Sequence, residues 1–305
     1  MRAGIDIGGT KTQAVVVDSA GQVVQQLRLP SGFGPEAVLS SALEAVTRVA
    51  ALAGTAVDEL HSIGVGIPGV VNSGSGRVTH AVNLGVDDLA FGAELSRRLG
   101  VPVRVENDVN AAAFGSFHRL GPGPTSSLAY LNLGTGLAAG LVLNGELWRG
   151  SRGAAGEIGH IPVDPNGPVC SCGQRGCLET VASGSAIARA WPTTHRSPVH
   201  DLFAAAAAGN GKAVEVKRAL VDNVASAVRV LVLTVDVNNV VIGGGISSLG
   251  DILLTEVRSE LQARAAQSPF LASLELADRV RIVPSGFPAA AVGAALVGAV
   301  MSEAA

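Results

Sequence analysis

Three cysteines stand close together in the second half of the sequence. Cys170, Cys172 and Cys177 have the spacing C-x-C-x4-C, and His160 lies ten residues before the first of them. Three thiolates and one imidazole complete the tetrahedral ligand set of a structural Zn²⁺ site. The alternatives are three ordinary buried thiols or a disulfide, and a disulfide is the weaker one in a protein expected to be cytoplasmic. We therefore predict a zinc site.

Two glycine-rich turns carry groups suited to phosphate. They are Asp6-Ile7-Gly8-Gly9-Thr10-Lys11-Thr12 and Gly134-Thr135-Gly136. Bare glycines let backbone N–H groups approach anionic oxygens, and the threonine hydroxyls add donors. The Asp6 carboxylate, at the end of an expected strand, suits Mg²⁺, commonly through a water molecule. For either segment alone, the alternative is a tight hairpin turn with solvent-facing threonines.

A third set of residues could move a proton. Asp108, in Glu106-Asn107-Asp108, stands where an expected strand enters an expected helix. A hydroxyl group that attacks a phosphoryl group needs such a carboxylate to orient it and to accept its proton. The alternative role for Asp108 is that of a helix N-cap, which does not exclude catalysis.

Glu157 and His160 form a further candidate pair. They are three residues apart, so a helical turn would point both side chains the same way. The alternative is a solvated glutamate and a hydrogen-bonded core histidine.

Two other glycine patterns resemble nucleotide-binding motifs but lack their context. Residues 64–69 satisfy G-x-G-x-x-G, yet Pro68 and the polar segment after it cannot form the helix that a dinucleotide fingerprint requires. Residues 4–11 resemble a P-loop, but Lys11 comes one residue too late and the segment lies between two strands. We exclude both readings.

The elements that must position these residues alternate between strands and helices. Strands are expected at 3–7, 14–18, 23–29, 62–67 and 101–108, and within 238–247, which ends in a glycine turn; helices are expected at 35–52, 89–100, 110–120, 212–235 and 288–304. The helices follow from apolar residues near a period of 3.6, and the strands from short apolar, β-branched runs. This alternation predicts an α/β fold.

An internal echo divides the chain. Residues 127–147 repeat the strand, glycine turn, strand and turn of residues 3–23. Two copies of a phosphate-binding hairpin predict two similar domains facing one cleft. We expect an N-terminal domain over 1–115, completed by a C-terminal helix at 290–305, and a larger domain over 116–289 that carries the zinc loop.

Composition narrows the class of protein. With 305 residues and 48% apolar residues, the chain can bury a core without disulfides. Its 22 basic and 25 acidic residues give a net charge of −3, and no basic run suits a nucleic acid. The N-terminus lacks the apolar core of a signal peptide, and the apolar tail is too short for a membrane span. We expect a soluble cytoplasmic protein that binds neither nucleic acid nor membrane.

Seven motifs give the sequence a resemblance to the ROK family (repressors, open reading frames and sugar kinases) of the sugar kinase/actin-like ATPase superfamily. They are DIGGTKT, GVGIPG, VENDVNAAAFG, LGTGLAAGLVLNGEL, GAAGEIGHI, CSCGQRGCLE and VVIGGGIS, in the order and spacing of the family. The resemblance implies two ribonuclease H-like (actin-like ATPase) domains flanking a cleft. It also implies ATP-dependent phosphorylation of a hexose, glucose first, with Mg²⁺, by a homodimer or homotetramer.

The same resemblance implies roles for individual residues. Asp108 becomes the catalytic base and a substrate contact. The other substrate contacts are Gly69, Asn107, Glu157, His160 and Glu179. The nucleotide contacts are Asp6, Gly8, Gly9, Thr10, Lys11, Thr12, Gly134, Thr135, Gly136, Gly243, Gly244 and Gly245; for Gly243–Gly245 the alternative is a plain tight turn. His160 would bind zinc through one ring nitrogen and meet the sugar through the other.

Three alternatives stay open on this evidence. The substrate could be mannose, fructose, N-acetylglucosamine or N-acetylmannosamine, or the protein could sense sugar without turnover. A third alternative is a sugar-responsive transcriptional regulator. The family's repressors carry a winged helix before the DxGGT motif, and because Asp6 leaves no room for one, we expect an enzyme.

Overall fold

The computed structural model describes residues 1–298, which form two compact units. The first unit comprises 1–121, 146–154 and 286–298, and the second comprises 122–145 and 155–285. The boundaries predicted from the sequence differ from these units mainly in 146–154, which the prediction placed in the larger domain. Of the predicted C-terminal helix, residues 299–305 lie outside the described residues.

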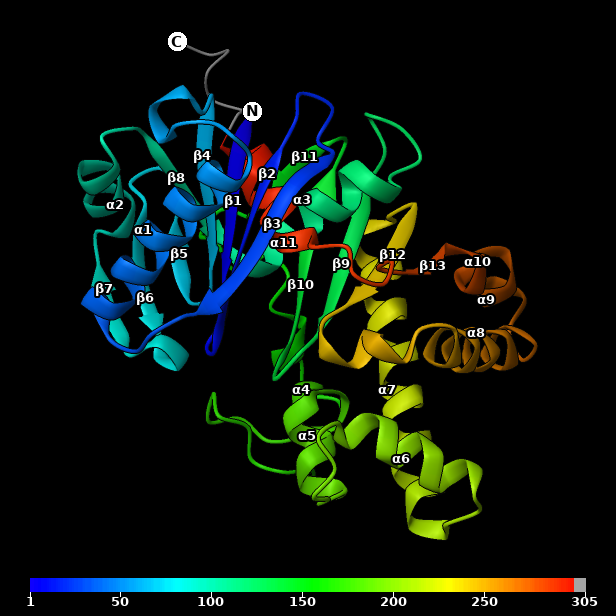
Figure 1. Cartoon of the computed structure of the whole chain (residues 1–305). Helices are drawn as coiled ribbons and strands as arrows, with labels where there is room; N and C mark the ends of the chain where they lie inside the picture. The colour runs from blue at the N-terminus through cyan, green and yellow to red at the C-terminus, as the bar shows by residue number, and fades with distance from the viewer. Residues whose placement is uncertain (299–305) are drawn as a thin grey trace. The chain divides into compact units, whose positions relative to one another are not determined.

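The first unit is built on a mixed sheet with the strand order β3-β2-β1-β4-β8 (Figure 1). Its strands are β1 (Arg2–Ile7), β2 (Lys11–Val17), β3 (Val23–Pro30), β4 (Ser62–Ile67) and β8 (Val103–Asn107). β2 pairs antiparallel with both β1 and β3, whereas β1 pairs in parallel with β4, and β4 with β8. The register places Asp6 opposite Gly66, and Gly66 opposite Glu106.

Helices cover both faces of this sheet, as the apolar run of β2 requires. Ala14 and Val16 share a buried cluster with α1 (Pro35–Leu52), while Val15 and Val17 share another with α11 (Ala289–Val297). The predicted helix at 35–52 is confirmed, with Pro35 in its first turn and a buried stripe of Val and Ala. α2 (Phe91–Leu99) and α3 (Asp108–Leu120) complete the set of longer helices in this unit.

A seam of glycines lets α11 lie directly on the sheet and on α3. A Cβ atom on Gly4, Gly64 or Gly115 would come within 2.0, 1.8 and 2.0 Å, respectively, of a carbonyl oxygen of α11. Gly64 is thus needed for helix packing.

Strand β5 (Val70–Asn72) follows the G-x-G-x-x-G pattern, and no helix opens there, which confirms that this pattern is not a dinucleotide fingerprint.

A small sheet extends the first unit. Its strands are β5, β6 (Arg77–Ala81) and β7 (Val86–Leu89), in that order, with a short 3₁₀ helix at Val82–Leu84. A second 3₁₀ turn lies at Val57–Glu59, and β11 (Glu146–Trp148) belongs to this unit as well. No strands were predicted at 70–89, because these strands are only three to five residues long and half of their residues are polar.

The second unit repeats the strand succession of the first. β9 (Leu128–Leu133) and β10 (Leu137–Leu143) form an antiparallel hairpin, and β12 (Asn239–Gly243) and β13 (Val280–Ile282) continue the sheet in parallel with β9. The order β10-β9-β12-β13 corresponds to β2-β1-β4-β8. The structural echo inferred from the two hairpins is therefore present in both sheets.

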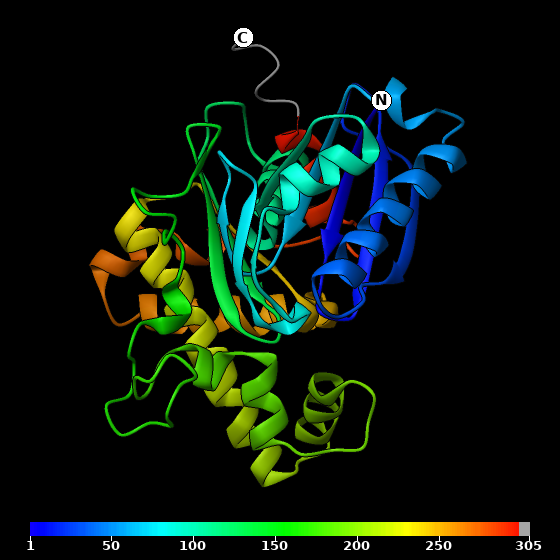
Figure 2. The same ribbon diagram turned by 90° about the vertical axis from the view of Figure 1, so that its left-hand side faces the viewer.

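Helices also form much of the second unit. The longest is α7 (Gly211–Val235), which Asn210 caps through a bond from the Ala213 N–H, and Figure 2 shows it as the long yellow helix. The others are α4 (Glu179–Ala182), α5 (Gly184–Ala190), α6 (Pro198–Ala207), α8 (Asp251–Ala265), α9 (Pro269–Ser273) and α10 (Leu276–Arg279), with 3₁₀ turns at Ile158–His160 and Gly245–Leu249. Within residues 1–298, no helix combines the length and the apolar character that crossing a membrane would take.

Candidate active site and metal cluster

The first unit gathers its candidate residues where its parallel strands end. Asp6 lies near the end of β1, and Asp108 is the first residue of α3, directly after β8. Carboxyl ends of parallel strands are the usual place for ligands in α/β sheets. The two carboxylates are close enough for the charge of Asp108 to act on Asp6.

The strand-to-helix junction is fixed by Asn107 and not by Asp108. The Asn107 side-chain oxygen accepts bonds from the N–H groups of Val109 (2.9 Å) and Asn110 (3.2 Å), so Asn107 is the N-cap of α3. The alternative role of Asp108 as the cap is wrong. Asp108 occupies the first helical turn, where the helix dipole favours a negative charge, and its carboxylate accepts a bond from the Val109 N–H at 3.0 Å.

Gly69 and Asn107, both predicted substrate contacts, lie side by side. The Asn107 amide nitrogen donates to the Gly69 carbonyl at 3.2 Å. Gly69 has a φ of +100°, and a Cβ atom there would come within 2.7 Å of the Thr79 carbonyl oxygen. Only glycine fits this position, and its conformation in turn presents the carbonyl to Asn107.

The first glycine turn closes the β1–β2 hairpin. The Gly8 N–H donates to the Lys11 carbonyl at 2.9 Å, and Gly9, Thr10 and Lys11 are exposed to solvent. Thr12 differs from them, because its hydroxyl is buried and donates to Ser31 at 3.1 Å. Thr10 and the backbone of the turn can therefore meet an anion, while the hydroxyl of Thr12 ties β2 to the residue that follows β3.

Asp6 is held in an environment that disfavours its charge. Loss of hydration, together with the negative charge of Asp108, raises the pKa of Asp6 to about 7, and the positive charge of Arg28 opposes this rise in part. In the unfolded chain the pKa of Asp6 is about 3.8. The folded protein therefore loses stability as the pH rises from 3.8 through 7, because Asp6 must ionise in its buried site. A cation at this carboxylate would offset that loss.

Replacing Asp6 with asparagine is expected to stabilise the protein at pH 8. Without added magnesium, the variant should melt several degrees above the wild type there, and the gap should close as the pH falls towards 4, because Asp6 is neutral at low pH in both states. Thermal melts between pH 4 and 8 measure this. The exposed Asp58→Asn serves as the control and should show no such trend. Equal melting of the wild type and Asp6→Asn at pH 8 would contradict the expectation.

In the second unit, Glu179 is locked against the second glycine turn. Its Oε2 accepts a bond from the Leu137 N–H at 2.9 Å, and a Cβ atom on Gly136 would lie 2.4 Å from that oxygen. Gly136 is thus needed for the carboxylate to reach the strand. One oxygen of Glu179 is used in this way, which leaves the other for a ligand.

His160 links Glu157 to the cysteine cluster. The two residues bracket a 3₁₀ turn, as the helical-turn prediction required, and the His160 Nε2 lies 3.9 Å from a Glu157 carboxylate oxygen. The other ring nitrogen, Nδ1, lies 3.7 Å from the Cys170 sulfur. The histidine therefore turns one edge to the cysteines and the other to a carboxylate.

The four predicted metal ligands converge on one point. The ligand atoms of His160, Cys170, Cys172 and Cys177 all lie within 4.8 Å of one another, and the sulfurs of Cys172 and Cys177 are 3.7 Å apart. In a tetrahedron with Zn–S bonds of about 2.3 Å, two sulfurs stand about 3.8 Å apart. A disulfide would need about 2.05 Å, so these thiols are free. The donor set fits zinc.

The thiols also differ in how readily they ionise. Hydrogen bonds from Gln174 lower the pKa of Cys172, whereas burial raises the pKa of Cys177. Thiolates packed this closely would repel one another unless a cation lay among them. A divalent metal would supply that charge and replace the protons.

The second glycine turn opens on a pocket of about 570 Å³ within the second unit. The pocket joins Gly134 and Thr135 to Gly245, which the sequence places 109 residues after Gly136. The start of α5 closes one side, since the N–H groups of Gly184 and Ser185 donate to the Gly134 and Thr135 carbonyls at 2.8 and 3.1 Å. Its other lining residues are Ile187, Ala188, Arg196, Ser197, Pro198, Val199 and Ile246.

The two other late glycines serve the close approach of β12 to β9. A Cβ atom on Gly243 would come within 2.1 Å of the Tyr130 hydroxyl, and one on Gly244, which has a φ of +82°, within 2.5 Å of the Leu133 backbone. The predicted triplet therefore has divided roles. Gly243 and Gly244 bring the strand ends together, and Gly245 reaches the pocket.

Sequence reasoning missed the apolar wall of this pocket. Ile187, Ala188 and Val199 lie on α5 and α6, a region where no helices were predicted. Both helices are short and rich in alanine, so their apolar periodicity is weak.

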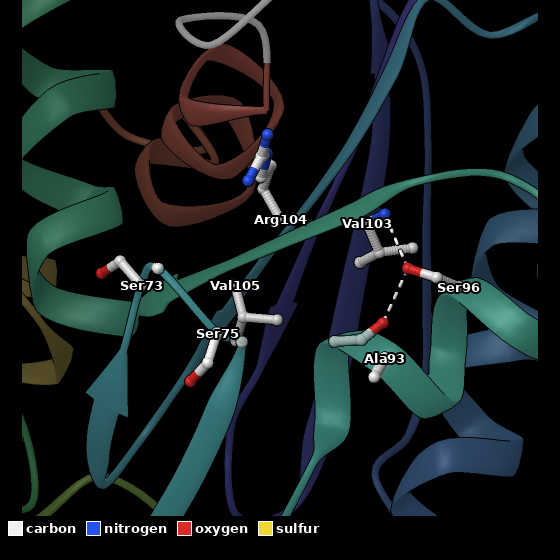
Figure 3. Close-up of a pocket in the computed structure, with 10 residues that line it drawn as sticks. Ser73, Ser75, Ala93, Ser96, Val103, Arg104 and Val105 are labelled. Atoms are coloured by element: carbon white, nitrogen blue, oxygen red, sulfur yellow. Dashed lines mark hydrogen bonds between the residues drawn. The ribbon is translucent and has the colours of Figure 1, made fainter.

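A smaller pocket in the first unit has a different composition. Its volume is about 210 Å³, and Figure 3 shows the polar side chains of Ser73, Ser75 and Ser96 around it. Ser96 is already engaged, because it donates to the Gly92 carbonyl and accepts from the Val103 N–H. None of the predicted site residues lines this pocket.

Comparison with known proteins bears on these sites. The family model described as ROK family matches residues 2–298. The chain is 32% identical to a glucokinase of Halalkalibacterium halodurans over 281 residues, which are 86% of this chain and 85% of that protein. Among solved structures it is similar to a ROK hexokinase from Thermus thermophilus, with a TM-score of 0.81, 32% identity and coverage of 100% of this chain and 99% of that one.

A second solved structure is that of a ROK family glucokinase from Streptomyces griseus in complex with glucose and AMPPNP. The TM-score is 0.79 at 29% identity, covering 97% of this chain and 98% of the other. The strand succession found in both units is that of the actin-like ATPase fold of these neighbours. The predicted fold class is confirmed.

Proposed function

Since the chain belongs to the ROK family and is a glucokinase-like sugar kinase, we propose how its residues divide the work of phosphorylating glucose with ATP. The observation that carries the proposal is the junction at Asn107-Asp108, where a capped helix holds a carboxylate at the end of a parallel strand. Phosphoryl transfer depends mainly on positioning and on charge stabilisation, and a rigid carboxylate of this kind provides the first.

Asp108 is the general base in this proposal. Its carboxylate orients the hexose hydroxyl and accepts its proton as the hydroxyl oxygen bonds to the γ-phosphorus and the bond to the ADP oxygen breaks. Asn107 and the Gly69 segment contact the sugar from the same unit. Glu157, His160 and Glu179 supply further acceptors and donors for its hydroxyl groups.

The nucleotide is proposed to use both glycine turns. Gly8, Gly9, Thr10 and Lys11 would meet the phosphates, with Thr12 in support, and Asp6 would hold Mg²⁺. Mg²⁺ supplies charge neutralisation for the transferred group. The pocket beside Gly134-Thr135 and Gly245 suits the adenosine, because its apolar wall can cover a flat ring and its volume falls within the usual range for ligand sites.

Zinc is proposed to be structural. The cluster of His160, Cys170, Cys172 and Cys177 would bind it with four protein ligands, which leaves no open position for chemistry. By fixing the His160 ring through Nδ1, the metal would present Nε2 to the sugar beside Glu157.

We further expect a cytoplasmic homodimer or homotetramer.

A coupled assay of ADP release tests the reaction and ranks the sugars. We expect turnover with glucose above that with mannose, fructose, N-acetylglucosamine and N-acetylmannosamine. Preference for another hexose would change the proposed substrate but not the proposed reaction. Calorimetric binding of hexose with no ADP formed would identify a sugar sensor, and sugar-dependent binding to operator DNA without turnover would identify a regulator.

A further inference from the structure

Glu106, directly before Asn107 and Asp108, is a buried carboxylate to which the proposed mechanism gives no role. Its side chain is 2% exposed at the end of β8. Burying a carboxylate is unfavourable unless its charge is paired and its oxygens accept hydrogen bonds. Both conditions are met here, by groups from three separate segments of the first unit.

The two carboxylate oxygens divide their partners. Oε1 accepts from the Asn107 N–H at 3.0 Å and from the Asn110 side-chain amide at 3.1 Å, which both belong to the start of α3. Oε2 accepts from the Ser73 hydroxyl at 3.1 Å, in the β5–β6 turn, and from Arg149. The Arg149 guanidinium lies 2.7 Å away through Nε and 2.6 Å through Nη2.

We propose that Glu106 is the positioning residue of the catalytic junction: it clamps the start of α3, and with it Asn107 and Asp108, to Arg149 and to the β5–β6 turn. The proposal rests on the kinase function proposed above. Oε1 fixes the peptide N–H of the helix cap and the first-turn side chain of Asn110. Oε2 bonds the same carboxylate to Ser73 and Arg149, which lie outside the helix. Residues outside α3 therefore fix the orientation of Asp108.

The chemistry of the clamp requires a carboxylate. An amide in the place of Glu106 would offer one acceptor and one NH₂ group, whereas all five contacts are donors. Turned one way, its NH₂ group would face the Arg149 guanidinium, and turned the other way it would face the Asn107 N–H, neither of which can accept a hydrogen bond. Glu106→Gln thus disturbs the clamp at nearly constant volume, which separates the effect from packing.

The test combines Glu106→Gln with the loss of the proposed base. The matched control is Glu44→Gln, which breaks an exposed ion pair with Arg48 on α1. We expect Glu106→Gln to lower kcat by about 100-fold, as a small misplacement of a reacting group does, and Glu44→Gln to leave kcat unchanged. In the Asp108→Asn background, Glu106→Gln should cause no further loss, because residues that act as a unit are not additive. A full multiplicative loss in that background would overturn the proposal.

A second readout is independent of turnover. Amide hydrogen exchange at Val109 and Asn110, whose N–H groups bond to the Asn107 cap, should be about tenfold faster in Glu106→Gln than in Glu44→Gln. If the wild type releases no ADP with any hexose, the proposed function fails, but hydrogen exchange still tests the clamp. Equal exchange rates in Glu106→Gln and Glu44→Gln would overturn the proposed clamp.

Discussion

Asp108→Asn is expected to lower kcat for hexose phosphorylation by about 10²–10⁴-fold, the range that a positioned general base contributes. Asparagine keeps an oxygen that can accept the Val109 N–H, so the start of α3 should keep its shape. Its amide cannot accept the proton of the sugar hydroxyl. The affinities for hexose and for nucleotide, measured by calorimetry, should change by less than about tenfold.

Asp58→Asn is the matched control for this experiment. Asp58 is an exposed aspartate of the same unit. It precedes the start of β4, whereas the candidate site lies at the carboxyl ends of the parallel strands, so its replacement should leave kcat unchanged. Wild-type rates of sugar-dependent ADP release from Asp108→Asn would refute the role of Asp108. A fall in kcat accompanied by loss of the helical circular dichroism signal would instead indicate damage to the fold.

The second large effect is expected at the cysteine cluster. Cys177 is fully buried, and Cys177→Ser removes one of four ligands, so the zinc content should fall from about one equivalent per chain to near zero. Metal binding is linked to folding, and losing several kcal/mol of it should lower Tm by about 5–10 °C. The KM for hexose should rise more than the KM for ATP, because His160 loses its support.

Asn166→Ala provides the control within the same loop. Asn166 is exposed and bonds to Asp164 through its backbone N–H, so the loss of its side chain should leave the zinc content and Tm unchanged. Metal analysis by mass spectrometry on protein purified without chelator gives the stoichiometry. A wild-type preparation that is free of metal, fully active and equally stable would refute the zinc site.

Strong local patterns made most of the fold predictable. The helix at 35–52 shows a clear 3.6-residue period and begins with proline, and the hairpins at 3–17 and 128–143 pair apolar runs across glycine turns. The convergence of His160 with the three cysteines was also predictable, because their spacing is typical of a set of metal ligands. These features depend on neighbours in the chain, which a sequence shows directly.

What escaped prediction depends on neighbours in space. Asn107 and Asp108 are both good caps, and only the backbone decides that Asn107 is the one. The wall of the large pocket comes from the alanine-rich α5 and α6, and the partners of Glu106 come from residues 33 and 43 positions away. The sequence around Arg149 does not indicate that this residue pairs with a buried carboxylate.

The glycine seam under α11 has a consequence for synthesis of the chain. Residues 4, 64 and 115 pack against a helix that begins at residue 289, so the first unit cannot finish packing until α11 has left the ribosome. At about 5–20 residues per second, α11 is synthesised at least about 9 s after Gly115. During this interval β1 and β4 expose the bare backbone surface that α11 later covers. The helix that carries the proposed base is thus translated well before it acquires its final support.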